Sequence, residues 1–389
     1  MATEDTATDI KLSTHRSGTL ARSSSTTTCV WAFAVDYGDA TYVAVSWEED
    51  GALWMGLVDP LSARSSSGEW TISSSTEVSS GLLSSSARVA DHWHIFAFGY
   101  QILTFSVDSA DDLWMLVVDT TLAVVQAIHV ANADGSDSPL SSLPDDTGTN
   151  DHFCVQADDT SLVAVSIGAG SAAGAHIPIR HYVYVVDIDT ELIDSEGDFT
   201  FSGSDILWES SATWLDQSHP CSALSLRLTS SSSITGYEWQ VLAPGALSGG
   251  ANVLYLLATE DLATESAELL SLERDPPVAG WDSSLQMATQ VLFSNGFRFV
   301  FCRSNVRPSP SVSPPSDAGD IVYWLLDDTL GFASGYSAGI PRVIGRTSTA
   351  IRRNRPHTSR FSSGGTDYLI LCWDERDGCH MRVYALAYG

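Results

Sequence analysis

A pair of short apolar segments recurs along the chain at a nearly constant spacing, and this repeat constrains the fold more than any other feature. In the first copy, YVAVSW at residues 42–47 is followed by a turn and then by ALWMGLVD at residues 52–59. ILTFSV at residues 102–107 and DLWMLVVD at residues 112–119 repeat this pair without a gap, since both segments are displaced by the same distance along the chain. A third copy begins with LVAVSI at residues 162–167. Self-similarity at such a period indicates a repeat architecture.

Three looser copies extend the repeat to the end of the chain. They begin with WQVLAP, RFVFCRS and YLILCW, at residues 239–244, 298–304 and 368–373. Each copy holds two strands rich in Val, Leu, Tyr, Phe and Trp, with a short apolar segment before most pairs and a Ser- and Thr-rich stretch after them. Four strands in each copy, repeated around a ring, is the pattern of a β-propeller, because each blade buries its faces against its neighbours.

We therefore expect an all-β chain that forms one six-bladed β-propeller domain over residues 1–389. The expected blades cover residues 14–64, 65–125, 126–200, 201–270, 271–335, and 336–389 together with 1–13. The last copy ends after its third strand, so we predict that the segment TDIKLS at residues 8–13 supplies the outer strand and that the two termini pair. A β-sandwich with coincidental spacing is the alternative, which the ungapped first three copies disfavour.

A tryptophan recurs on the third strand of several copies, at Trp54, Trp114 and Trp324. We expect these side chains to pack in the cores of the blades. Platforms on which sugar rings stack are the alternative use of tryptophan at such positions.

Histidines recur where the innermost strand of several copies is expected to begin. His92 and His152 are separated by one repeat, and His219 and His357 hold the corresponding place in the fourth and sixth copies. Because inner strands line the central channel of a propeller, we expect these imidazoles to gather at one mouth of the channel. Such a cluster can bind an anion, hold a metal, or act as acid and base near neutral pH. Alternatively, each histidine caps its strand by bonding a backbone carbonyl group.

Part of the third copy resembles the motif of the BNR-repeat propellers. NDHFCVQADDTSLVAVSIGAG at residues 150–170, with His176 after it, is similar to the family pattern D-H-N-x-x-x-L-x-x-x-x-D-G-R-L-x-x-x-Y-x-G-H. SHPCSALSL at residues 218–226 and RPHTSRF at residues 355–361 are similar to the segments that begin its strands. The family includes lyases that cleave uronic-acid polymers such as ulvan, and glycan-binding or tail-associated proteins of tailed viruses.

The resemblance implies which residues would form a lyase site. It assigns acid–base work to His152, and it assigns neutralisation of the uronate carboxylate to His176 and Arg227. Neutralising a uronate carboxylate lowers the pKa of the C5 proton that must leave. The position of the family's tyrosine falls on His219, which could serve as the base, and the turn glycine is absent at residues 159–161. These departures favour a role other than catalysis.

The balance of charges restricts the partners. Acidic residues number 48 against 19 basic ones, of which Lys11 is the one lysine, and the net charge is −29. This balance disfavours nucleic acid and anionic membranes as partners. The acidic, lysine-poor composition suits a protein kept soluble in high salt, and codon bias is the alternative explanation of that composition. Six arginines nevertheless fall within residues 342–360, including Arg352, Arg353 and Arg355. They would bind an acidic neighbouring subunit, bind an anionic glycan, or pair with acids of the same chain.

The sequence contains no motif that predicts a resident cofactor. Acidic turns at residues 108–112 and 187–191 are candidates for Ca²⁺, although their spacing differs from an EF-hand and solvated turns are the simpler interpretation. The polar N-terminus is unlike a secretory signal, and no apolar run reaches the ~18 residues that a membrane-spanning helix needs.

Together these features favour a propeller that binds or scaffolds without catalysis. We expect a tail or capsid-surface component of a tailed virus of a halophilic prokaryote, made without a signal peptide, which attaches to host glycans and contacts other subunits of a large assembly. The corresponding location is the virion or an extracellular surface. Two alternatives stay open: a polysaccharide lyase or glycoside hydrolase that acts on acidic polysaccharide, and a cellular lectin.

Overall fold

The computed structural model describes side chains for most of residues 32–127 and 356–385 and for Ile321, Tyr323 and Leu325; elsewhere it describes the backbone of the strands given below. Throughout these residues the regular structure is β-strand, so the expectation of an all-β chain is confirmed for the described part. In this part the chain forms no helix of the length and apolarity needed to cross a membrane.

The strands follow one another in groups of four, except that the third group contains five. The first run contains β2 (Val30–Asp36), β3 (Val43–Glu49), β4 (Ala52–Val58) and β5 (Trp70–Glu77). The second sheet contains β6 (Val89–Ala97), β7 (Tyr100–Val107), β8 (Leu113–Val118) and β9 (Val124–His129). The third contains β10 (His152–Ala157), β11 (Leu162–Gly168) and β12 (Ile179–Val185), which pairs with both β13 (Thr200–Phe201) and β14 (Trp208–Glu209). The fourth contains β15 (Ser222–Ser225), β16 (Trp239–Ala246), β17 (Asn252–Thr259) and β18 (Ala267–Leu272).

The remaining strands complete the pattern and bring the two ends of the chain together. The fifth sheet contains β19 (Leu285–Leu292), β20 (Arg298–Ser304), β21 (Asp320–Leu326) and β22 (Arg342–Val343). The last run contains β23 (Asn354–Ser363), β24 (Thr366–Glu375), β25 (Gly378–Tyr388) and β1 (Ile10–Ala21). Within each group, the strands that pair with one another are antiparallel.

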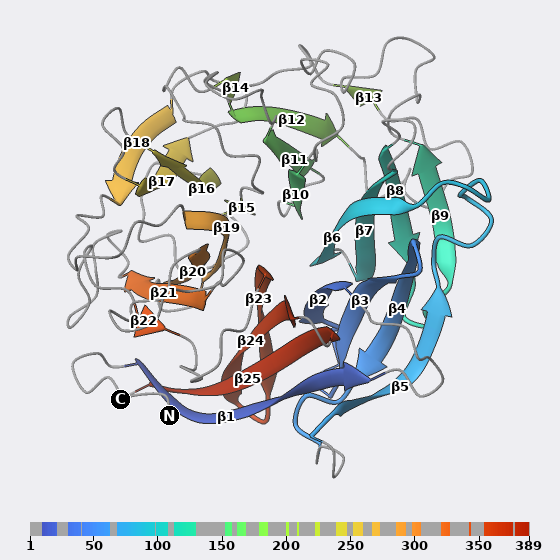
Figure 1. Cartoon of the computed structure of the whole chain (residues 1–389), viewed down its shortest axis with the longest axis horizontal. Coiled ribbons are helices and arrows are strands. Elements are labelled where there is room, and N and C mark those ends of the chain that lie inside the picture. The colour runs from blue at the N-terminus through green and yellow to red at the C-terminus, as the bar shows by residue number, and fades with distance from the viewer. Residues whose placement is uncertain are drawn as a thin grey trace, which may run out of the picture.

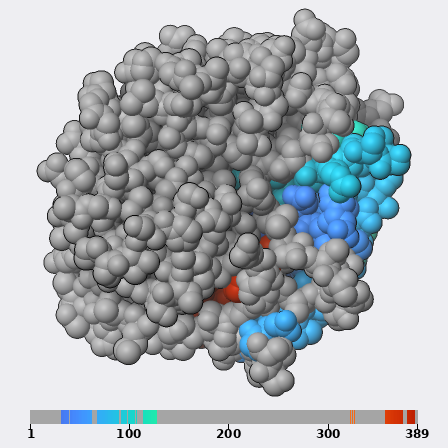
Figure 2. All heavy atoms as spheres, in the orientation of Figure 1, coloured from blue at the N-terminus to red at the C-terminus, as the bar shows by residue number. Residues whose placement is uncertain are grey.

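The sheets lie around a common centre (Figure 1). The first strand of each group lies nearest this centre, and these strands contact one another in a closed cycle. The order of the cycle is β2, β6, β10, β15, β19, β23 and again β2. The described side chains up to residue 127 form one sector of the molecular surface in the same view (Figure 2).

Strand β1 closes the arrangement. It pairs antiparallel with β25 from Ile10 opposite Tyr388 to Thr19 opposite His380, so the predicted pairing of the two ends is confirmed. The strand is longer than the predicted 8–13, and its last two residues pair in parallel with Trp70 and Thr71 of β5. The first and last runs therefore form one eight-stranded sheet, ordered β2-β3-β4-β5-β1-β25-β24-β23.

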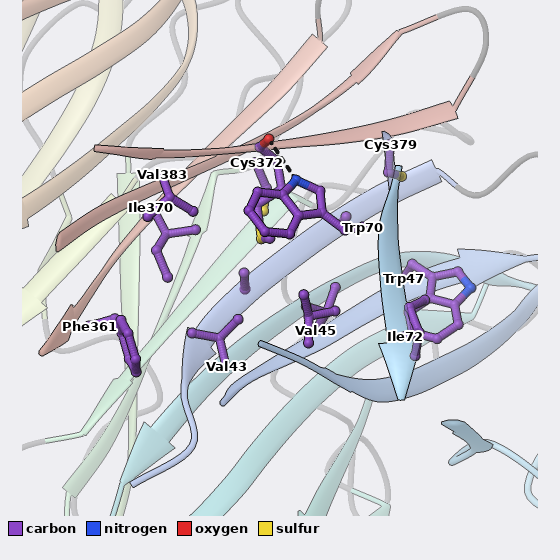
Figure 3. Close-up of a cluster of buried hydrophobic side chains, with 14 residues drawn as sticks. Val43, Val45, Trp47, Trp70, Ile72, Phe361, Ile370, Cys372, Cys379 and Val383 are labelled. Atoms are coloured by element: carbon purple, nitrogen blue, oxygen red, sulfur yellow. Dashed lines mark hydrogen bonds between the residues drawn. The ribbon is translucent and has the colours of Figure 1, made fainter. Parts of the chain in front are cut away.

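The first run is buried on both faces because it packs between two neighbours. Alternate residues of β3 point to opposite sides, so Val43, Val45 and Trp47 contact the last run while Ala44 contacts the second sheet. The core shared with the last run is shown in Figure 3. In it the indole N–H of Trp70 donates to the main-chain oxygen of Met381 at 3.2 Å, which ties β5 to β25.

The repeat in the sequence is not an identical repeat in register. Trp54 lies opposite Trp47, so a shift by one repeat would place Trp114 opposite Val107. Instead, Trp114 lies opposite Phe105. The difference is two residues, and an even shift keeps every side chain on the same face of its strand. Trp54 and Trp114 therefore still pack against the cores, which confirms that expectation for both, whereas the side chain of Trp324 lies outside the described residues.

Candidate functional site

The inner strands of three neighbouring groups share an irregularity close to where each begins. The register shifts between Val30 and Phe33 in β2, between Val89 and Asp91 in β6, and between Asn354 and His357 in β23. Such bulges bend a strand and change the direction in which the next side chains point. The side chains at or just after these bulges are Phe33, His92 and His357, and they meet.

Phe33 is the centre of a cluster of rings. Its ring centroid lies 4.7 Å from that of His92, 5.2 Å from that of Trp93 and 4.2 Å from that of His357. Trp93 and His357 are also in edge-on contact, at 5.4 Å. Every member is at most 8% exposed, so the cluster fills the space between β2, β6 and β23 instead of facing solvent. Two of the predicted histidines are thus brought together, in a buried position.

A third buried histidine, His94, lies beside this cluster. Burial lowers the pKa of His94 from 6.5 to about 3, although its hydrogen bond to Gln101 acts in the opposite direction. Burial, together with the charge that His94 would carry, also lowers the pKa of His357 from 6.5 to about 3. Both imidazoles are therefore neutral at neutral pH. General acid–base catalysis works best when the pKa lies near the working pH, so neither side chain is suited to that role.

Hydrogen bonds join His94 to the first run in a chain with a fixed direction. The main-chain oxygen of Asp36 can only accept, so the Gln101 atom 3.2 Å away is the amide nitrogen, and the other Gln101 atom is an acceptor. His94 must then donate from Nε2 to Gln101 Oε1, at 2.9 Å. Because neutral His94 carries one N–H, its Nδ1 accepts from the Ser46 hydroxyl, at 3.0 Å. Ser46 Oγ in turn accepts from His92 Nε2, at 3.2 Å.

This chain crosses between two sheets. Ser46 and Asp36 belong to the first run, whereas His92, His94 and Gln101 belong to the second sheet. Ser46, His92 and His94 are 0% exposed and Gln101 is 1% exposed. We call these four side chains and the Asp36 carbonyl group the polar seam. It satisfies polar groups that would otherwise be costly to bury at this contact.

His92 and His152, which are one repeat apart in the sequence, occupy different register positions in their strands. His92 lies opposite Phe105, within β6, whereas His152 is the first residue of β10 and lies opposite Gly168. A shift by one repeat would put His152 opposite Val165, which is three residues away. The turns explain the difference, since two residues separate the last pair of β6 and β7, Ala97 and Tyr100, whereas five separate the last pair of β10 and β11, Ala157 and Val163. Strand β10 contacts β6, but the side chain of His152 lies outside the described residues.

The other predicted site residues are not placed by the structure. His176, His219, Arg227, Arg352 and Arg353 lie outside the described residues, as do the acidic turns at 108–112 and 187–191. Arg355 belongs to β23, but its side chain is likewise outside them.

Sequence reasoning missed three members of the polar seam. His94 follows His92 by two residues, so strand alternation places both on one face, and that signal was present in HWHIF. Ser46 lies on the face of β3 that meets the second sheet, but nothing in the sequence says which neighbouring residue its hydroxyl would contact. Gln101 reaches His94 because the two strands of its hairpin are antiparallel, which the pattern of apolar residues does not specify.

Acidic residues that recur in the repeat have a local structural role. Asp59 Oδ1 accepts from the main-chain N–H groups of Leu61 and Ser62. Asp119 Oδ1 accepts from the main-chain N–H groups of Thr121 and Ala123. Both aspartates thus stabilise the turn after the third strand of their group. In the part of the chain that the structure describes, no group of three or more His, Cys, Asp or Glu side chains is arranged to hold a metal ion.

Comparison with known proteins supports the fold. No model of a protein family matches the sequence, and no curated protein matches it. The sialidase of Trypanosoma rangeli, solved with sialic acid, is similar with a TM-score of 0.50 and 10% identity, over 99% of this chain and 58% of the sialidase. An endo-arabinase from Bacteroides thetaiotaomicron has a TM-score of 0.43 and 13% identity, over 77% of this chain and 94% of the enzyme. A protein of the DUF4221 family from Bacteroides vulgatus has a TM-score of 0.46 and 8% identity, over 97% of each chain.

The sialidase is a β-propeller enzyme, and its similarity to almost the whole of this chain supports a β-propeller fold. At 10% identity the likeness is one of fold alone.

Proposed function

We propose that the chain is a six-bladed β-propeller that binds glycan without cleaving it. The blade count is supported by the closed cycle of contacts among β2, β6, β10, β15, β19 and β23, each of which begins one group of strands. The pairing of β1 with β25 supports a ring closed by the two ends of the chain. Closure in this way leaves no long unpaired edge at the seam between the first and last blades.

The observation that carries the non-catalytic part is the state of the central histidines. His94 and His357 are buried, and their pKa values of about 3 leave them neutral and unable to exchange protons with a substrate near neutral pH. Their contacts are with aromatic rings and with the polar seam, which is the behaviour of side chains that join blades. Within the described residues these histidines hold sheets together.

Glycan is the ligand class that the similarity to the sialidase favours, since that protein was solved with sialic acid. Sialic acid is an anionic sugar, and an anionic sugar needs positive charge in its binding site. In this chain the arginines at 342–360 provide such charge locally, against a net charge of −29.

We further propose that the protein is a tail or capsid-surface component of a tailed virus of a halophilic prokaryote. The support is compositional: 48 acidic residues, a single lysine, and the resemblance of three copies to BNR-repeat motifs. A surface of this charge stays soluble where salt screens its repulsion. If virions that lack the protein still adsorb normally to cells, the attachment role is wrong.

The enzymatic alternative has its own support in the similarity to a sialidase. It would use His152, His176, His219 and Arg227 on an acidic polysaccharide. The two functions separate in one experiment, in which purified protein is incubated with uronate polymers and the absorbance of unsaturated products is followed. We expect saturable binding with no rise in absorbance. A rise in absorbance that is lost in the variant His152→Ala would establish the lyase and contradict our proposal.

The third alternative, a cellular lectin, is tested by the neighbourhood of the gene.

A further inference from the structure

The polar seam joins the first run to the second sheet at the place where their inner strands meet. Its donors and acceptors alternate between the two sheets, from His92 to Ser46, back to His94 and Gln101, and finally to the Asp36 carbonyl group. When His94 is neutral, only one arrangement of protons satisfies every hydrogen bond in this chain, because the Asp36 carbonyl group cannot donate.

We infer that the polar seam is an acid-sensitive contact, which holds β2 and β3 of the first run against β6 and β7 of the second sheet while His94 is neutral, and which opens locally when His94 is protonated. The inference goes beyond the proposed glycan binding and does not rest on it.

Protonation changes the seam at a particular atom. A proton added to His94 goes to Nδ1, since Nε2 already carries the hydrogen donated to Gln101. Nδ1 then becomes a donor facing the hydroxyl group of Ser46, which had been donating to it. The Ser46 hydroxyl must turn around, and a positive charge is left in a site that is 0% exposed. Burying a charge is costly unless an opposite charge or several hydrogen-bond acceptors compensate it.

The groups that face His94 offer no such compensation among the described residues. From β3 it meets the Ser46 hydroxyl, from β7 the Gln101 amide, and from β2 the main-chain oxygen of Asp36 through Gln101. The Asp36 carboxylate accepts instead from the N–H of Gly38, at 2.8 Å. On its own strand the other titratable residues are His92 and Asp91, of which the Asp91 side chain lies outside the described residues, and β10, which contacts β6, carries His152.

The last run adds a second titratable group rather than a counter-charge. His357 of β23 contacts both Phe33 and Trp93, and the charge that His94 would carry disfavours a charge on His357. Its Nδ1 is buried and has no hydrogen-bond partner. Acid therefore weakens the contact of the first run with the second sheet and, through the ring cluster, the contact of β2 with β23 as well.

Hydrogen exchange of the intact protein tests this inference. We compare the amide exchange of β2 and β6, corrected for intrinsic rates, between about pH 7 and about pH 5, with β8 as the internal control. Opening linked to one proton should raise exchange of β2 and β6 about tenfold for each pH unit below 6.5, while β8 changes little. Unchanged exchange in β2 and β6, or an equal rise in β8, would overturn the inference.

Two variants sharpen the test. His94→Gln removes the titrating group of the polar seam while keeping an amide donor for Gln101, so it should markedly diminish the acid-induced rise, leaving at most the part that His357 contributes. His380→Gln is the matched control, because His380 stacks on Trp373 of the last run, at 5.6 Å, away from the polar seam. It should keep the full rise. An undiminished rise in His94→Gln, or a lost rise in His380→Gln, contradicts the assignment to His94, and the exchange of the unaltered protein decides the matter if a variant does not fold.

Discussion

Ser46 has the most demanding position of any single residue in the polar seam, because one hydroxyl group serves two imidazoles. It donates to His94 and accepts from His92, and it is fully buried. Alanine is close to serine in shape and leaves both ring nitrogens without this partner. Leaving a buried donor or acceptor without a partner costs more free energy than a typical hydrogen bond contributes, on balance, to the stability of the fold.

Ser46→Ala should therefore lower the free energy of unfolding by about 1–3 kcal/mol, measured by urea denaturation. Ser73→Ala is the control: the Ser73 hydroxyl bonds the main-chain oxygen of Leu57 at 3.1 Å, but at an exposed position. It should change stability by no more than about 0.5 kcal/mol. Equal effects of the two substitutions would show that the hydrogen bonds of Ser46 contribute no more to stability than the exposed hydrogen bond of Ser73.

The depressed pKa values of His94 and His357 also set how stability depends on pH. Between about 6.5 and about 3 the unfolded chain binds more protons at these sites than the folded chain does. Their contribution is complete above pH 6.5 and is lost as the pH falls toward 3. The free energy of unfolding should drop by up to about 1.4 kcal/mol per pH unit for each histidine. Urea midpoints that stay constant from about pH 7 to about pH 5 would contradict this account.

At the scale of strands, the lengths of the turns set the register of strand pairing, which a repeat in the sequence does not specify. The pairs of apolar segments, their order and the buried tryptophans were predictable because they depend on alternation and composition. The register was not, since turns of different length move His152 by three residues and Trp114 by two relative to their counterparts. The seam could not be predicted for the same reason: it needs Ser46 to meet His94 across two sheets.

Strands β4 and β5 show how closely the backbones within a blade approach. A Cβ atom on Gly56 would lie 2.5 Å from Ile72 Cγ2 and 2.6 Å from the main-chain oxygen of Ser74. Gly56→Ala should therefore destabilise the fold by about 1–3 kcal/mol through overpacking. Ser75→Ala, at the exposed position directly opposite Gly56, is the control and should be nearly neutral. Equal melting temperatures of the two variants in thermal unfolding would contradict the close approach of β4 and β5.

At the scale of the whole molecule, β1 joins the beginning of the chain to its end. The sequence predicted the pairing from the missing fourth strand of the last copy. It did not predict that β1 would extend to Ala21, because IKLSTHRSGTLA has no regular apolar alternation and is held by backbone pairing. This pairing is what distinguishes a closed ring from an open row of sheets, in which β25 and β5 would each present an unpaired edge.

A disulfide formed across β1 and β25 tests ring closure most directly. Thr14 lies opposite Ala385, whereas Ala387 lies opposite Lys11. Directly opposed residues of antiparallel strands have Cα atoms about 4.5–5.5 Å apart, which is within the range of a disulfide. The double variant Thr14→Cys/Ala385→Cys should oxidise within one chain, seen as a faster-migrating monomer on a non-reducing gel, and Thr14→Cys/Ala387→Cys should do so poorly. Failure of the matched pair to link, or links between separate chains, would contradict a ring closed by its own two ends.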